Sequence, residues 1–294
     1  MTIEIAANVG SARIDIAYER LGDAHAPPVL LIMGLGAQLI AWPDGFCAEL
    51  VGRGLQVIRF DNRDAGQSTH LAGTPDMAAA LAGDASSASY TLSDMASDAV
   101  GLLDALGIER AHVVGASMGG FIAQTIALEH RGRIRSLTSI MSSTGDRAVG
   151  QPHAEAMRIF AGPPPTGRED VVQRAVAAFE IVGSPGFPAD LAGVAERAGR
   201  AYDRGFDPGG FVRQAVAVLA SGDRTARLRA LDVPALVIHG ADDRLVDASG
   251  GRATAAAISG AELVVIDGMG HDLPAALWQR FATTIAALVQ RSEV

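Results

Sequence analysis

Two patterns of apolar and polar positions follow one another in turn along the chain, one typical of buried strands and one typical of helices. Short apolar runs rich in β-branched residues are typical of strands buried on both faces of a sheet. They occupy residues 29–33, 55–60, 112–114, 134–141, 235–239 and 263–266. Longer segments between them repeat their apolar residues every three or four positions, as residues 92–106 do, which predicts helices with one buried face. This alternation predicts an α/β fold built on a mostly parallel, doubly wound sheet.

Two further strands are expected near the start of the chain. Residues 3–6 and 12–19 are strand-like, and in the second segment Ile14, Ile16 and Tyr18 alternate with residues that face the other way. We expect these strands to pair antiparallel at one edge of the sheet. Residues 77–89 are mostly small and are predicted to form a loose surface loop.

The alternation stops between residues 144 and 226. Prolines punctuate this segment, and no strand-like run occurs in it. Helical periodicity appears instead, at residues 169–182, 191–202 and 210–219. We therefore expect a helical cap, inserted after the sixth strand and lying over the carboxyl edge of the sheet. The predicted core comprises residues 1–143 and 227–294, and the predicted cap comprises residues 144–226.

The composition is globular and acidic. The chain has 294 residues, of which 49% are hydrophobic, and its formal charge is −9. Negative charge disfavours nucleic acid as a partner, because the phosphates would be repelled. No apolar run approaches the ~18 residues of a membrane span, and residues 1–4 do not open a basic and apolar leader, so we expect a cytoplasmic protein with no membrane span. The single cysteine, Cys47, excludes an internal disulfide and a cysteine-based metal cage.

A candidate nucleophile lies in residues 111–124, which read A-H-V-V-G-A-S-M-G-G-F-I-A-Q and carry the spacing G-x-S-x-G at a turn from strand to helix. The serine of such an elbow has a strained backbone, and side chains two positions before and after it would collide with the neighbouring strand and helix. Gly115 and Gly119 therefore meet a geometric need, whereas Ser117 supplies the nucleophile. The Met118 amide, at the start of the helix, can point at a developing oxyanion.

Gly34-Leu35-Gly36 follows the first buried strand and permits two interpretations. Glycines at this place can hold a pyrophosphate, and Asp61 ends the next strand, where a ribose partner would be expected. The third glycine of that fingerprint is missing, because position 39 is Leu and no helix is expected to begin before Pro43. We therefore favour a loop that shapes an oxyanion hole, and we expect no cofactor.

A serine hydroxyl needs a base, and the base needs an acid that orients it. The loops after the last two strands supply candidates, since Asp242 and Asp243 follow one of them and His271 follows the other in a glycine-rich loop. In a parallel sheet both loops lie at the same edge as Ser117. We predict His271 as the base and prefer Asp243 to Asp242 as the acid.

The remaining histidines have structural interpretations. His239 ends a strand before a glycine, which indicates a turn-stabilising role, and His112 begins the elbow strand, where packing or hydrogen bonding is expected. The others show no ligand-like spacing, so no metal site is expected. They are His25, His70, His130 and His153.

With these motifs the chain resembles the α/β-hydrolase superfamily over essentially its whole length, and within it the serine esterases of the aclacinomycin methylesterase group. The similar segments are I-M-G-L-G at 32–36, A-W-P at 41–43, V-I-R-F-D-N-R-D-A-G-Q-S at 57–68, H-V-V-G-A-S-M-G at 112–119, V-P-A-L-V-I-H-G-A-D-D at 233–243 and D-G-M-G-H-D-L-P at 267–274. The resemblance implies Ser117 as nucleophile, His271 as base, and Asp243, the second carboxylate of the pattern H-G-x-x-D-x-x-V, as acid. It also implies the backbone amides of Leu35 and Met118 as the oxyanion hole.

Two comparisons with the superfamily bear on the chemistry. Many members have His-Gly where this chain has Met33-Gly34, which leaves the Leu35 amide available but removes a polar side chain beside it. Haloalkane dehalogenases and epoxide hydrolases resemble the chain in topology but use Asp as nucleophile, so Ser117 argues against both.

The expected activity is hydrolysis of a carboxylic ester of an apolar small molecule, a methyl ester being one candidate, through an acyl-enzyme. Perhydrolysis, carbon–carbon bond hydrolysis and acyl transfer by the same triad are alternatives, and a ligand-binding sensor that keeps the fold is another class. Large aromatic residues, most of them in the cap, are candidate substrate contacts, although each could be internal packing instead. They are Trp42, Phe160, Phe179, Phe187, Tyr202 and Phe206.

Overall fold

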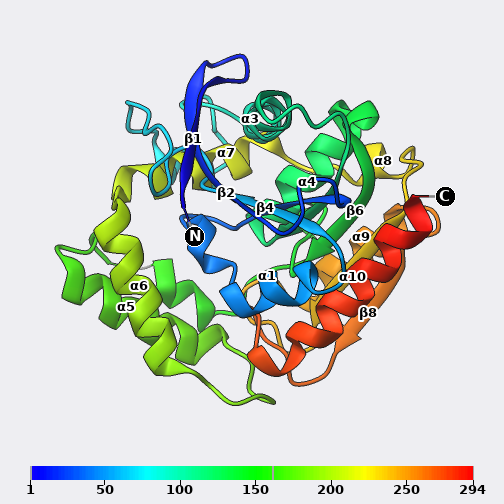
Figure 1. The fold of residues 1–294 in the computed structure, drawn as a ribbon. Helices are drawn as coiled ribbons and strands as arrows, with labels where there is room; N and C mark the ends of the chain where they lie inside the picture. The colour runs from blue at the N-terminus through cyan, green and yellow to red at the C-terminus, as the bar shows by residue number, and fades with distance from the viewer. Residues whose placement is uncertain (1, 161, 294) are drawn as a thin grey trace.

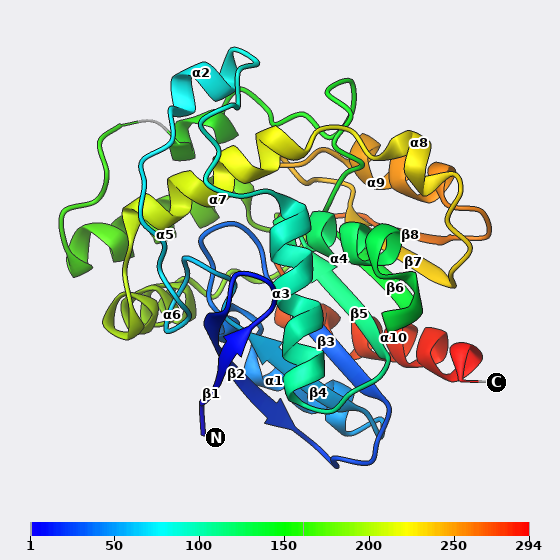
Figure 2. The same cartoon turned by 90° about the horizontal axis from the view of Figure 1, so that it is seen from above.

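The core of the structure is an eight-stranded sheet with the order β1-β2-β4-β3-β5-β6-β7-β8 (Figures 1 and 2). The computed structural model describes residues 2–160 and 162–293. The pairs β1–β2 and β2–β4 are antiparallel, and the remaining pairs are parallel. The strands are β1 (Glu4–Val9), β2 (Ile14–Leu21), β3 (Pro28–Ile32), β4 (Gln56–Phe60), β5 (Ala111–Ala116), β6 (Ile134–Ile140), β7 (Ala235–Gly240) and β8 (Glu262–Ile266). The predicted mostly parallel sheet and its antiparallel edge are confirmed.

Helices connect the strands and cover both faces of the sheet. They are α1 (Asp44–Val51), α2 (Met77–Leu81), α3 (Leu92–Ala105), α4 (Met118–Glu129), α5 (Arg168–Val182), α6 (Leu191–Arg204), α7 (Pro208–Ser221), α8 (Thr225–Leu228), α9 (Ala248–Ala257) and α10 (Trp278–Ser292), with short 3-10 turns η1 (Leu39–Ala41), η2 (Arg131–Arg133), η3 (Ala156–Phe160) and η4 (Ala275–Leu277). Within residues 2–160 and 162–293, none of these helices has the length and apolarity to cross a bilayer.

The hydrophobic core is divided by the sheet into two clusters. One cluster joins the sheet to α3 and α4 and contains Leu102 and Ile122, and the other joins it to α1 and α10 and contains Phe46 and Phe281. Parallel strands covered on both faces need apolar side chains at successive positions, which explains their unbroken apolar runs. The doubly wound arrangement is therefore confirmed.

One local prediction was wrong. The segment predicted as a loose loop, residues 77–89, contains the helix α2, which begins after Asp76. The Asp76 carboxylate caps it by accepting a hydrogen bond of 2.9 Å from the amide of Ala79. A side-chain cap and three consecutive alanines favour a helical turn here, and they outweigh the small size of the residues.

The segment predicted as the cap contains η3, α5, α6, α7 and the start of α8, with no strand among its described residues. In both views α5 and α6 lie at one end of the molecule, opposite α8 and α9, while α7 returns toward α3 (Figures 1 and 2). α7 also buries Ala217 in the cluster of α3 and α4, so it shares the hydrophobic core. The division at residues 144 and 226 stays a prediction.

Two buried ion pairs join this segment to the loop after β4. Arg204, the last residue of α6, lies 2.9 Å from Asp61, and Arg213 of α7 lies 2.9 Å from Asp64. Both carboxylates are fully buried. Asp64 also accepts hydrogen bonds from the Tyr90 hydroxyl at 2.6 Å and the Leu71 amide at 2.7 Å. A buried carboxylate needs such partners, so these pairs fix α6 and α7 on the core.

The ion pair of Arg213 makes a testable contribution to stability. Arg213→Met should lower the free energy of unfolding by about 3 kcal/mol, because it leaves the Asp64 carboxylate buried without its cation. The measurement is urea unfolding followed by circular dichroism. Arg168→Met is the matched control, since Arg168 also pairs with an aspartate, Asp203, but both side chains are more than half exposed. Equal losses in the two variants would contradict the role given to the buried pair.

Candidate active site

The turn from β5 into α4 is a strained elbow centred on Ser117. Ser117 has φ 56° and ψ −122°, a conformation that costs free energy for a residue with a side chain. Its amide donates to the Ile140 carbonyl at 2.9 Å, and its carbonyl accepts from the Ser142 hydroxyl at 2.9 Å. Both bonds tie the elbow to β6 and the loop that follows it, so the neighbouring strand maintains the strain.

Glycines allow the close approaches that the elbow requires. A Cβ added to Gly115 would lie 2.0 Å from the Gly119 carbonyl oxygen, and one added to Gly119 would lie 2.0 Å from the carbonyl oxygen of Ile32 in β3. Both contacts are with backbone atoms, which cannot rotate away. The G-x-S-x-G spacing thus reflects contact between the first turn of α4 and β3.

Ser117, His271 and Asp243 form a continuous hydrogen-bonded series. His271 Nε2 lies 3.0 Å from Ser117 Oγ, and His271 Nδ1 lies 2.7 Å from Asp243 Oδ2. The three residues come from the loops after β5, β8 and β7, whose carboxyl ends meet at one edge of the sheet. In this geometry an imidazole can accept the hydroxyl proton while the carboxylate stabilises the imidazolium.

Asp243 is held as a carboxylate by its surroundings. Its Oδ1 accepts hydrogen bonds of 2.9 Å from the amides of Leu245 and Val246, and the ring of His239 lies 3.5 Å from its Oδ2. Burial alone would raise the pKa of the Asp243 carboxyl, but His271, His239 and the Val246 amide together hold that pKa well below its ordinary value. Asp242 is exposed and binds the Gly268 amide at 2.8 Å, so only Asp243 contacts the imidazole.

His239 and His112 have the structural contacts expected of them. His239 is fully buried, and its Nε2 lies 2.7 Å from the Val246 carbonyl oxygen, which closes the loop that carries Asp243. His112 lies between the Ser136 hydroxyl at 2.8 Å and the Glu293 carboxylate at 2.9 Å.

The loop after β3 forms a tight turn beside Ser117. The Ala37 amide donates to the Gly34 carbonyl at 3.2 Å, and Gly36 has φ +67°, which a side chain would disfavour. A Cβ on Gly34 would lie 3.0 Å from Ser117 Cβ, so this turn and the elbow are in contact. Within the described residues, the amides of Leu35 and Met118 donate no hydrogen bond, which leaves both available to an oxyanion.

The loop of His271 is tied to the segment after α5. The His271 amide donates to the Val182 carbonyl at 2.7 Å, and the Gly270 amide donates to the Ser184 hydroxyl at 2.9 Å. Ser184 in turn donates to Asp272. Burial raises the pKa of the Asp272 carboxyl above its ordinary value, although this hydrogen bond opposes the shift. No sequence motif indicated these contacts, because they join residues more than eighty positions apart.

The six predicted substrate contacts fall in different surroundings. Trp42 is fully buried and stacks on Phe46 with ring centroids 5.5 Å apart. Tyr202 and Phe206 pack against each other at 5.1 Å. Phe179 and Phe187 line an open cavity of about 330 Å³ beside α5.

Phe160 belongs to an aromatic pair over the turn beside Ser117. Its ring lies 6.2 Å from that of Phe211 on α7, and a Cβ on Gly36 would lie 2.8 Å from the Phe211 ring. Phe160 is 45% exposed, so the pair borders solvent as well as the turn. Sequence reasoning missed Phe211, whose position at the turn depends on how α7 packs.

A second open cavity, of about 640 Å³, includes Asp243 and Arg244 in its lining. Neither of these two cavities is lined by Ser117, Leu35 or Met118 in the described part of the chain. The roles of the predicted substrate contacts therefore stay predictions.

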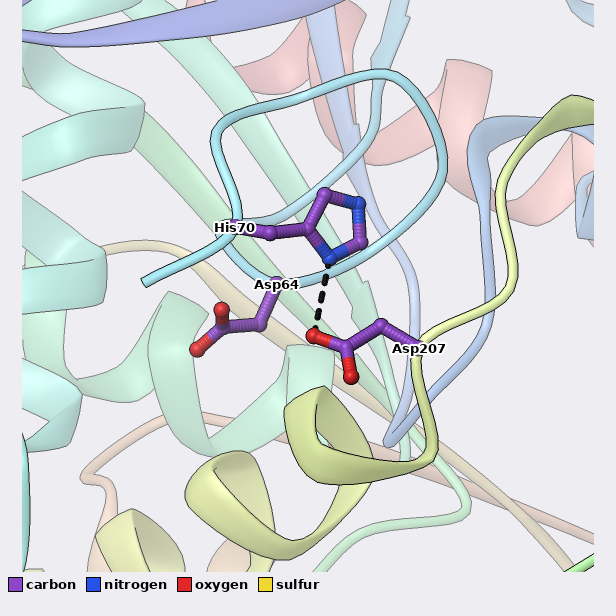
Figure 3. Close-up of side chains that lie close together, drawn as sticks. All are labelled: Asp64, His70 and Asp207. Atoms are coloured by element: carbon purple, nitrogen blue, oxygen red, sulfur yellow. Dashed lines mark hydrogen bonds and ion pairs between the residues drawn. The ribbon is translucent and has the colours of Figure 1, made fainter. Parts of the chain in front are cut away.

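One group of metal-ligand type side chains lies near the cap, among the residues that the structure describes. It consists of Asp64, His70 and Asp207 (Figure 3). His70 Nδ1 lies 3.1 Å from Asp207, while the Arg213 guanidinium contacts Asp207 at 2.5 Å and Asp64 at 2.9 Å. An arginine that binds both carboxylates already supplies the compensating charge, so the group anchors α7 and is a poor fit for a cation.

The close approach at the elbow yields a stability prediction. Gly119→Ala should destabilise the protein by at least about 3 kcal/mol, because the added methyl overlaps the Ile32 carbonyl and neither backbone can move freely. Thermal unfolding by differential scanning fluorimetry measures the effect. Gly132→Ala is the control, since Gly132 is exposed and has no neighbour within 4 Å of an added Cβ. A melting temperature of Gly119→Ala equal to that of Gly132→Ala would show that the elbow tolerates a side chain there.

Several known proteins are similar to this chain over most of its length. A rhodomycin D methylesterase from Streptomyces peucetius is 29% identical over 300 residues, which cover 94% of this chain and 95% of that protein. The crystal structure of an enol-lactonase from Burkholderia xenovorans LB400 has a TM-score of 0.72 and 25% identity, covering 96% of this chain and 98% of the other. A hydrolase from Pseudomonas aeruginosa PA01 has a TM-score of 0.72 and 26% identity, covering 99% and 98%.

The sequence profile of the alpha/beta hydrolase fold matches residues 27–274, which are most of the chain. This match agrees with the strand order and with the resemblance seen in the motifs. The chain therefore belongs to the alpha/beta hydrolase family.

Proposed function

We propose that the protein hydrolyses carboxylic esters of apolar small molecules through an acyl-enzyme. The strongest support is the hydrogen-bonded series of Ser117, His271 and Asp243 at the strained elbow. An ordinary surface serine has neither a base within hydrogen-bond reach nor a backbone held in this conformation. Family membership and the methylesterase relative favour the same chemistry.

In the first half-reaction Ser117 Oγ attacks the ester carbonyl carbon while His271 Nε2 accepts its proton. Asp243 orients the imidazole through Nδ1 and stabilises the imidazolium that forms. The carbonyl oxygen becomes an oxyanion, which accepts hydrogen bonds from the amides of Leu35 and Met118. The tetrahedral intermediate then collapses, and His271 returns the proton to the departing alcohol.

In the second half-reaction water attacks the acyl-enzyme. His271 takes a proton from this water, and the oxyanion forms again in the same place. On collapse His271 returns that proton to Ser117 Oγ, which releases the carboxylic acid and restores free Ser117. No cofactor enters either half-reaction.

The proposed substrate is apolar, with a methyl ester as one candidate. Phe211 and Phe160 present apolar surface next to the turn of Leu35, where an acyl or alcohol group would lie. The relative that acts as a rhodomycin D methylesterase spans 94% of this chain, which favours ester hydrolysis over the other reactions that the same triad could perform.

The nucleophile is tested by Ser117→Ala. Turnover of p-nitrophenyl acetate should fall about 10⁴-fold or more, because the series loses its nucleophile, while far-UV circular dichroism stays unchanged. A fluorophosphonate should label the unaltered protein on Ser117, as located by mass spectrometry of its peptides. Substantial turnover by Ser117→Ala, or labelling at another residue, would refute the proposal.

The acid is tested by comparing neighbours. Asp243→Asn should lower kcat about 10⁴-fold, because an amide favours the wrong imidazole tautomer. Asp242→Asn, the matched control, should lower kcat less than about 10-fold, since Asp242 contacts the Gly268 amide and not the imidazole. Steady-state kinetics on p-nitrophenyl acetate distinguishes the two, and equal losses would reassign the acid.

A further inference from the structure

A buried amide side chain, that of Gln214, lies between the segment predicted as the cap and the turn beside Ser117. Gln214 is on α7 and is fully buried. Its Oε1 accepts a hydrogen bond of 2.8 Å from the amide of Gly36, and its Nε2 donates one of 2.7 Å to the carbonyl of Arg63. One side chain therefore holds the loops after β3 and β4 together.

The contact with Gly36 bears directly on the Leu35 amide. The peptide group before Leu35 is held through the Gly34 carbonyl, which accepts from Ala37 at 3.2 Å. In a trans peptide the N–H points away from the C=O, so this bond turns the Leu35 N–H outward from the turn. The peptide group after Leu35 is held through the Gly36 amide by Gln214. Both peptide planes that flank the Leu35 Cα are thus restrained.

The other hydrogen bond described for this loop does not hold the Gly36 amide. The end of the same loop is held separately, because the Leu39 amide donates to Asp61 at 2.6 Å. Gly36 has φ +67°, and its lack of a side chain leaves its backbone with more freedom than any other residue would have. Without Gln214 the Gly36 amide would lose its acceptor, and the turn would rearrange to find another.

We propose that Gln214 is a positioning residue for the oxyanion hole, and that α7 thereby helps to aim the Leu35 amide. The proposal rests on the proposed function. In this proposal α7 has two roles: Phe211 lies beside the substrate, and Gln214 supports the amide that stabilises the transition state. A donor that lies outside about 2.7–3.1 Å of the oxyanion loses most of its effect.

The test replaces the amide by a side chain of similar length that cannot hydrogen-bond in the same way. Gln214→Met should lower kcat and kcat/KM for p-nitrophenyl acetate by the same factor, roughly 10- to 100-fold, with KM within about 2-fold of its original value. Inhibition by 1,1,1-trifluoro-2-butanone, whose adduct with a serine carries an oxyanion, should weaken by a similar factor.

Gln38→Met is the matched control. Gln38 is also a buried glutamine that joins the core to α6, through hydrogen bonds to the carbonyls of Ala201 at 2.7 Å and Gly205 at 2.9 Å, but it does not contact the Gly36 amide. Its replacement should lower the melting temperature and leave kcat within about 3-fold. If Gln214→Met is not obtained folded, Gln214→Asn, which is one methylene too short to reach Gly36, serves in its place.

The outcomes separate the positioning role from the proposed function. Equal kcat values in the Gln214 and Gln38 variants, or a change confined to KM, would overturn the positioning role while Ser117→Ala remains inactive. Turnover by Ser117→Ala would instead overturn the proposed function itself.

Discussion

The structure depends on the close contact between the first turn of α4 and β3. Gly119 lies so near the Ile32 carbonyl that no side chain fits between them, and Ser117, two residues earlier, has a strained backbone conformation. The same approach places Gly34, two residues beyond β3, against Ser117. One packing contact between a helix and a central strand therefore brings Ser117, the Met118 amide and the loop of Leu35 to the same place, and the cost of the strain is offset by the buried core on either side.

Polar contacts also join the loops after the strands to helices α5, α6 and α7. Asp61 and Asp64 receive arginines from α6 and α7, and the His271 loop is held by the carbonyl of Val182. The loops that bear the candidate chemistry are thus bound to the segment above them as well as to the strands below. Buried charges and amides of this kind are costly when unpaired, so they favour a single arrangement of the loops.

The sequence predicted those parts of the molecule that depend on local spacing. Strand runs, the elbow glycines and the order of Ser117, the acid and His271 all follow from short-range pattern, and the structure brings these three residues together. Gln214 and Phe211 had no such signal, because each meets Gly36, which lies more than 170 residues away in the chain. The burial of Trp42 likewise depends on the packing of α1, so aromatic character alone could not separate packing residues from substrate contacts.

Different residues of α7 contact different loops of the core. Phe211 and Gln214 are one helical turn apart and meet the turn of Gly36, while Gly210 and Arg213 meet Asp64. Each of these positions holds the geometry near Ser117 or attaches the helix to the core, and the backbone of Gly210 is so close to the Asp64 carbonyl that it admits no side chain. Under the proposed function, substitutions in α7 that change substrate preference are therefore expected on its other faces or at the ring of Phe211. In α5 the last residue, Val182, holds the His271 loop through its backbone carbonyl, which constrains its side chain less. The side chains of this segment that are best able to vary are those that take no part in holding the loops.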